Sequence, residues 1–108
     1  MKAINIHAKE WFDKVNGNSY FSGTVTITKD TSEQETFLMP FQYGYGSQYE
    51  QEAKAILTQF NKISTNYETL NSYCKREGLV LISKIEKGCL KRELKAIEKT
   101  YNNNLETV

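Results

Sequence analysis

A stretch of nine residues combines tyrosine with glycine: residues 41–49 read FQYGYGSQY and follow the chain's only proline. Tyrosine offers a large contact area, is enriched at binding hot spots and can stack on unpaired bases. The same aromatics could instead fold back over a sheet edge, with the glycines permitting positive φ. We expect Tyr43 and Tyr45 to serve recognition, and Phe41 and Tyr49 to serve the core. The predicted binding residues are Tyr43, Tyr45, Gln42, Gln48 and Tyr20.

A second group of residues is basic and lies near the C-terminus, within KIEKGCLKRELKAIEK. Lysines recur there at intervals of four residues, which on a helix would form one ladder. Glutamates are interleaved with them, so a solvated helix face with internal ion pairs is one interpretation. Nucleic-acid binding is the other, and it requires that the cations remain unneutralised. Its predicted residues are Lys87, Lys91, Arg92 and Lys95, with Lys99 continuing the ladder.

Residues suited to catalysis or metal binding are sparse. His7 is the only histidine, and no spacing suggests the partner that a catalytic base needs. Cys74 and Cys89 are far from it and from each other, so no metal-ligand pattern results. Glu50 and Glu52 suit the first turn of a helix, and GYGSQ matches neither nucleotide-binding glycine motif. We expect no enzyme activity, no cofactor and no metal, with weak phosphate contact at this helix start as an alternative.

Length and composition indicate one domain spanning residues 1–108. The chain is 39% hydrophobic and 25% charged, and its net charge of +1 provides no overall field toward DNA or an anionic membrane. No run approaches the ~18 apolar residues that span a bilayer, and the N-terminus lacks the apolar run of a signal peptide. Two cysteines without a CxxC pattern suit a reducing compartment. We expect a cytoplasmic protein with a frayed tail over residues 101–108.

The first strand and the turn after it are predicted by alternation and by turn chemistry. In residues 2–12 the apolar side chains change parity at Trp11, which predicts a bulge after Lys9. Asn16-Gly17 predicts a type I′ hairpin turn, because both central residues of that turn need positive φ. The buried face of this strand is expected to carry Ile4, Ile6 and Ala8.

Two further strands complete an antiparallel meander. Residues 20–29 alternate, and their threonines are predicted to face solvent. Residues 35–41 place three apolar side chains on one face, and Pro40 indicates that this strand is an edge or stops there, because proline cannot donate to a ladder. The predicted buried faces are Phe21, Gly23, Val25 and Ile27 on the second strand, and Phe37, Met39 and Phe41 on the third.

Helical periodicity begins at Ser47. SQYE predicts a capping box, in which the Ser47 hydroxyl accepts from the Glu50 amide while the Glu50 side chain reaches back. A second helix over residues 66–77 begins with the similar TNYE and ends at Gly78. The apolar stripes are Tyr49, Ala53, Ile56, Leu57 and Phe60 on the first helix, and Tyr67, Leu70 and Cys74 on the second.

One strand and one helix are expected in the rest of the chain. LVLISKI, residues 79–85, predicts a short strand with both faces largely covered, and Gly88 ends it. A final helix is predicted from apolar residues at helical spacing, which are Leu90, Leu94, Ile97 and Tyr101. The expected fold is α+β, a three-stranded antiparallel meander followed by helices with an additional strand, in the order β-β-β-α-α-β-α.

Two longer motifs, EWFDKVNGNSYFSGTVTI and PFQYGYGSQYEQEA, resemble a group of short uncharacterised proteins of bacteriophages and related mobile elements. The resemblance covers roughly the first half of the chain and implies a phage-type origin. The group has no established activity, so the resemblance implies no catalytic residues. The matching residues are Trp11, Phe12, Asp13, Lys14, Asn16, Gly17, Asn18, Ser19, Tyr20, Pro40, Phe41, Tyr43, Gly44, Tyr45, Gly46, Tyr49 and Ala53.

Two hypotheses about function follow. The first is a small non-enzymatic phage-type binding protein that inhibits or redirects a host protein by direct contact, with CRISPR effector complexes among the candidate targets. The alternative is a nucleic-acid-binding accessory protein that uses the Tyr43/Tyr45 loop and the lysine-rich final helix. Salt separates them, because phosphate neutralisation releases counterions and makes nucleic-acid binding strongly salt-dependent. A minor enzyme is the third alternative.

Overall fold

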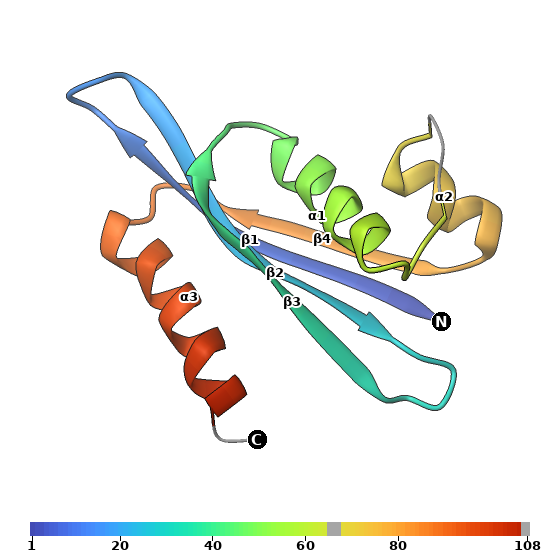
Figure 1. The fold of residues 1–108 in the computed structure, drawn as a ribbon. Coiled ribbons are helices and arrows are strands. Elements are labelled where there is room, and N and C mark those ends of the chain that lie inside the picture. Colours follow the sequence, from blue (N-terminus) through green and yellow to red (C-terminus); the bar gives the residue numbers. More distant parts are fainter. Residues whose placement is uncertain (65–67, 107–108) are drawn as a thin grey trace.

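A computed structural model describes residues 1–64 and 68–106 of the chain. A four-stranded sheet in the order β3-β2-β1-β4 has two helices on one face and one helix on the other (Figure 1). This α+β arrangement and its order, β-β-β-α-α-β-α, confirm the predicted fold class. The elements are β1 (Ala3–Asp13), β2 (Asn18–Thr28), β3 (Gln34–Tyr43), α1 (Gln48–Gln59), α2 (Leu70–Glu77), β4 (Val80–Glu86) and α3 (Lys91–Glu106).

The main core lies between the sheet and the helices α1 and α2. Alternate residues of the three meander strands point into it, as the period of two predicts. The α1 stripe packs against them through four of its five predicted members, whereas Phe60 stays half exposed and stacks on Phe37. The buried members are Ile4, Ile6, Ala8, Phe21, Val25, Ile27, Phe37, Met39, Tyr49, Ala53, Ile56, Leu57, Ile63, Leu70, Tyr73 and Cys74.

The second face of the sheet is covered in part by α3. Thr24 and Thr36 lie beneath this helix with Ile97 and Tyr101, and the Tyr101 hydroxyl donates to the Thr36 carbonyl at 3.3 Å. Leu94 of α3 is fully buried. The prediction that the β2 threonines face solvent was therefore wrong for Thr24, which α3 covers, and all three threonines of β2 are half-buried.

The predicted bulge in β1 does not exist. β1 pairs with β2 without a register shift from Ala3↔Thr28 to Asp13↔Asn18. Trp11 follows the regular alternation of β1 and points to the α3 side. An apolar residue occurs at this position because α3 covers part of that face, and no extra residue is inserted in the strand. The register shift occurs between β2 and β3, where Phe21↔Gln42 is followed by Gly23↔Met39. One residue of β2 thus opposes two residues of β3, at Pro40 and Phe41.

This bulge moves Phe41 out of the core. Two residues beyond Met39, it was expected on the same buried face, but it stacks on Tyr20 on the α3 side. The assignment of Phe41 to the core was therefore wrong. Pro40 does lie on an edge strand, as predicted, although β3 continues past it to Tyr43.

The hairpin turns where Asn16-Gly17 predicts, but with a different turn type. Residues 14–17 form the loop between the paired residues Asp13 and Asn18, and only Gly17 takes positive φ, at 71°. The Asp13 carboxylate accepts the amides of Val15 at 3.0 Å and Asn16 at 3.3 Å, and the Gly17 amide donates to the Asp13 carbonyl at 2.7 Å. These bonds close a loop of residues 14–17, which is longer than the two-residue loop of a type I′ turn.

The helix starts differ in detail from the predictions. Ser47 is the N-cap of α1 but makes no side-chain cap, so the first capping box is absent. Its φ and ψ of −89° and 10° lie outside the extended region that presents a capping hydroxyl to the amides. α2 begins at Leu70 rather than at residue 66, with Thr69 accepting from the Ser72 amide at 3.1 Å. The predicted place of Tyr67 in the apolar stripe, and the first three residues of the predicted cap TNYE, fall outside the described residues.

The C-terminal elements correct two expectations. β4 is an edge strand parallel to β1 and is largely exposed, so its two faces are not both covered. Helix α3 extends to Glu106 through most of the segment that was predicted to fray. Among the described residues, no helix combines the length and apolarity needed to cross a bilayer.

Candidate binding surface

Four aromatic side chains gather on the α3 side of the sheet, at the hairpin end of β1 and β2. Trp11 lies opposite Tyr20, and Tyr20 lies opposite Tyr43, so strand register alone brings three of them together. Tyr20 stacks on Trp11 at 5.4 Å and on Phe41 at 5.2 Å between ring centroids, and meets Tyr43 edge-on at 5.9 Å. The bulge supplies the fourth ring, because it turns Phe41 to this side.

Two lysines of α3 lie over these rings. The ammonium of Lys91 is 5.5 Å from the centre of the Trp11 ring, and that of Lys95 is 4.2 Å from the centre of the Phe41 ring. Both distances lie within the range of cation–π attraction. We call Trp11, Tyr20, Phe41, Tyr43, Lys91 and Lys95 the aromatic–lysine surface.

The positive charge continues along α3. Lys91, Arg92, Lys95 and Lys99 line one shallow hollow together with Ala96. Among the side chains that the structure describes, no ion pair within 4.0 Å neutralises any of these four cations. The interpretation of the lysines as a face of internal ion pairs is therefore not supported there.

The neighbouring carboxylates are engaged elsewhere. Glu93 reaches back to accept the Leu90 amide at 2.5 Å, at the start of α3. A hydrogen bond from the Asn16 side chain is the largest cause of a lowered Asp13 pKa, and the charge of Lys91 contributes less. Asp13 is thus hydrogen-bonded within its own turn, and its carboxylate remains charged near Lys91.

The other predicted binding residues have local roles. The Gln48 side chain accepts the Tyr45 amide at 2.8 Å, and the Gln42 side chain donates to the Pro40 carbonyl at 3.0 Å. Tyr45 itself is 64% exposed and Tyr43 is 58% exposed. Lys87 precedes α3, so it is not on the helical ladder, which contains only Lys91, Lys95 and Lys99.

The structure therefore joins two sets of residues that the sequence offered as alternatives. Tyr20 and Tyr43 belong to the predicted aromatic site, and Lys91 and Lys95 to the predicted basic site, yet they form one surface. Sequence reasoning missed Trp11 and Phe41 as members. The sequence held one indication of Trp11: it is an apolar residue that alternates in step with the polar residues of β1.

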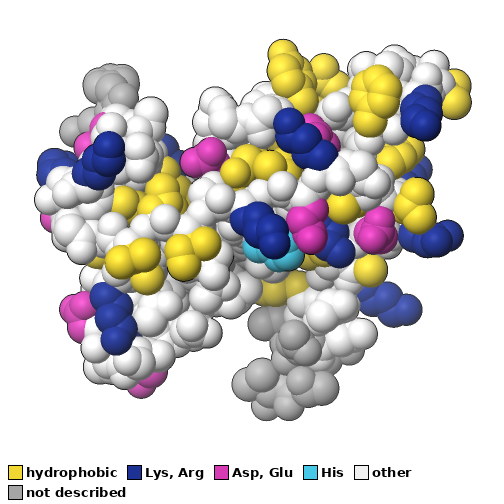
Figure 2. Space-filling view, turned by 180° about the vertical axis from the view of Figure 1, so that it is seen from behind, with side chains coloured by type: hydrophobic (Ala, Val, Ile, Leu, Met, Phe, Trp, Pro, Cys, Tyr) yellow, Lys and Arg dark blue, Asp and Glu magenta, His cyan; other side chains and the backbone are white. Residues whose placement is uncertain are grey.

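A small polar cluster lies farther along this face. His7 Nε2 is 3.1 Å from a Glu86 carboxylate oxygen, and Lys9 Nζ is 4.0 Å from the same oxygen. Figure 2 shows the histidine beside a lysine and an acidic side chain on the open face. Within the described part of the chain, no group of three ligand-type side chains could hold a metal ion. Desolvation raises the pKa of both cysteine thiols, which disfavours reactive thiolates.

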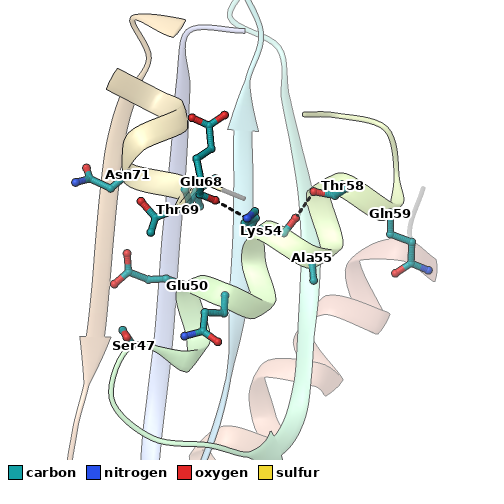
Figure 3. Close-up of a pocket in the computed structure, with 11 residues that line it drawn as sticks. Ser47, Glu50, Lys54, Ala55, Thr58, Gln59, Glu68, Thr69 and Asn71 are labelled. Atoms are coloured by element: carbon teal, nitrogen blue, oxygen red, sulfur yellow. Dashed lines mark hydrogen bonds between the residues drawn. The ribbon is translucent and has the colours of Figure 1, made fainter. Parts of the chain in front are cut away.

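A second hollow lies between α1 and α2 (Figure 3) and has a volume of about 1060 Å³. Most of its lining residues have polar or charged side chains, and they come from both helices and from the segment before α2. Lys54 bridges the two sides by donating to the Glu68 carbonyl, and Arg76 holds the Glu68 carboxylate at 2.6 Å. Lys54 of α1 and Glu68 of the segment before α2 are therefore occupied in contacts between these segments.

Comparison of the chain with protein-family models, with curated proteins and with solved structures gives no match.

Proposed function

We propose that the chain is a small phage-type protein that acts by binding rather than by catalysis, in the cytoplasm of the host cell. Its aromatic–lysine surface contacts an acidic patch on a host protein and thereby inhibits or redirects that protein, with CRISPR effector complexes as one candidate class. The observation that supports this proposal is the placement of Lys91 and Lys95 on a stacked group of aromatic rings.

The arrangement of the rings favours a protein partner over unpaired bases. Base stacking requires a free aromatic face. Tyr20 is stacked on Trp11 and on Phe41, and lysine ammonium groups lie over the latter two rings. Tyr43 is the cluster member that is mainly exposed, and its ring stands at 81° to the ring of Tyr20. An exposed tyrosine beside half-buried rings and lysines has the composition of a protein-binding hot spot with acidic preference.

Affinity capture from host lysate, with and without nuclease, tests the proposal. We expect the wild-type protein to retain one host protein after nuclease treatment. Tyr43→Ala and the pair Lys91→Glu with Lys95→Glu should each lose it, with a hot-spot loss of ~2 kcal/mol or more for Tyr43. Lys75→Glu is the matched charge control, because this exposed lysine lies on α2, on the opposite face. Equal capture by all variants would contradict the proposal.

Nucleic-acid binding is the second candidate, and it is favoured by the row of four cations on α3, which have no ion pair with the side chains that the structure describes. Purified protein would be titrated with single-stranded and double-stranded probes over a range of salt concentrations. If phosphates bind this row, the logarithm of affinity should fall linearly with the logarithm of salt, and the slope should decrease by about one for each lysine removed. Absence of any probe shift at low salt would eliminate this candidate.

A further inference from the structure

The two edges of the sheet differ in how they are protected from pairing. β3 carries Pro40 and a bulge, both of which obstruct the addition of a strand. β4 has neither device: its seven residues contain no proline or glycine, and it pairs with β1 in unbroken register from Val80 to Glu86. Edge strands of this kind are templates for pairing.

The backbone groups on the open side of β4 follow from its pairing with β1. The Val80 amide donates to the Lys2 carbonyl, so Val80 and every second residue after it point their backbone groups at β1. The amides and carbonyls of Leu81, Ser83 and Ile85 therefore point away from the sheet. Among the described residues, no backbone partner pairs them on that side.

The side chains of β4 on the α3 side are also open. Val80 is 59% exposed and Ile82 is 53% exposed, although both are apolar. Helix α3 packs on β1, β2 and β3 and leaves β4 uncovered. An edge without proline or bulge, with two exposed apolar side chains beside Lys84 and Glu86, is thus open at both its backbone and its side chains.

We infer that this edge pairs with a second copy of the chain, β4 against β4 in antiparallel orientation, to give one sheet of eight strands. The register is centred on Ser83. Leu81 of one copy then exchanges both backbone hydrogen bonds with Ile85 of the other, and the two Ser83 residues exchange theirs across the two-fold axis. This register satisfies all three outward-facing residues of each copy.

The side chains support this occupant and this register. With Ser83 on the axis, Ile82 lies opposite Lys84 of the second copy, and Val80 lies opposite Glu86, so no like charges are directly opposed. The two Ile82 side chains become diagonal neighbours across the axis, where they shield each other from water. A register centred on Lys84 would place two lysines opposite each other, and one centred on Ile82 would leave Ile85 unpaired. The edge is therefore complementary to itself, and it shares no residue with the aromatic–lysine surface.

Mass measurement by light scattering tests this inference. The wild-type protein should move from 12.5 kDa toward twice that mass as its concentration rises from micromolar to millimolar. Ile82→Lys should stay monomeric, because the new lysine would oppose Lys84 of the second copy. Val15→Lys is the control, since this hairpin residue is 92% exposed and should dimerise like wild type.

Hydrogen exchange in the wild-type protein gives a readout that needs no variant. The amides of Leu81, Ser83 and Ile85 should exchange more slowly as the dimer forms, while the amides that already pair with β1 change little. Three results would each overturn the inference: a wild-type mass that stays at 12.5 kDa, an Ile82→Lys variant that associates like wild type, or a dimer in which these three amides gain no protection.

Discussion

Phe37 and Phe41 provide a direct test of the bulge in β3. Without a bulge the two residues would share the buried face and would cost similar amounts to truncate. In the structure Phe37 is only 8% exposed within the main core, whereas Phe41 lies half-buried on the other face, between Tyr20 and Lys95. Phe37→Ala and Phe41→Ala should therefore differ in both stability and spectroscopic effect.

The magnitudes follow from burial and from the ring contacts. Truncation of a fully buried phenylalanine costs about 3–5 kcal/mol, which includes the cavity, and this range applies to Phe37. Half-burial of Phe41 gives a transfer loss of about 1 kcal/mol, and solvent prevents a sealed cavity. Its stacking on Tyr20 adds about 0.5–1.5 kcal/mol, so the total is about 2 kcal/mol.

Urea denaturation followed by circular dichroism gives the two free energies of unfolding, and tryptophan emission reports on position. Trp11 is the only tryptophan and lies 6.3 Å from the Phe41 ring, so Phe41→Ala should shift its emission in the native state. Phe37→Ala should leave this emission unchanged. If Phe41→Ala destabilises as much as Phe37→Ala and leaves the emission unaltered, Phe41 belongs to the core and the bulge is misplaced.

Three other perturbations test local structure. Gly23→Ala should lower the free energy of unfolding, measured in urea, by ~3 kcal/mol or more, because the new Cβ would lie 2.3 Å from a backbone oxygen of β1. Gly17→Ala should lower it by about 1–2 kcal/mol, because only the positive φ opposes the substitution. Thr69→Ala should lower the free energy of unfolding by about 1 kcal/mol through loss of its cap, whereas Ser47→Ala, with no cap bond, should change it by less than about 0.5 kcal/mol. The pKa of Asp13 is lowered in the folded protein, so this carboxylate stabilises the fold at pH values above its ordinary pKa of 3.8. The contribution is lost as the pH falls through the lower pKa of the folded state. Melting temperatures of wild type and Asp13→Asn should therefore converge in acid.

The fold was predictable where local patterns decide it. Helical spacing from Tyr49 to Leu57 and strand alternation from Phe21 to Ile27 each encode one buried face, and the structure buries those residues. Gly78 ends α2 with φ of 69°, as its position after the last apolar residue indicates. These signals require only the neighbouring residues along the chain, so a single sequence contains them.

Two errors in the predicted fold, the exposed threonines of β2 and the bulge in β1, share one cause, which is the second layer formed by α3. Periodicity says which residues share a face but not whether an element far along the chain covers the opposite face. The threonines of β2 suit an exposed surface and a covered one equally well, and Trp11 was explained by a bulge because no second apolar layer was expected. The exposure of β4 has a different origin: a β-branched run is compatible with a central strand or an edge, and strand order is decided by tertiary pairing.

The candidate site shows the same limit at the level of function. Tyr43 and Lys91 are 48 residues apart in the sequence, and each was assigned to a different kind of partner. Their union depends on the bulge that turns Phe41 and on the docking of α3 over β2, neither of which a local pattern encodes. Because the tyrosine and the lysine form one surface, its partner must suit both aromatic rings and ammonium groups. Because lysines lie over the rings of Trp11 and Phe41, a partner that contacts these two rings must approach ring edges and ammonium groups together, and carboxylates beside apolar side chains meet that requirement better than stacked bases do.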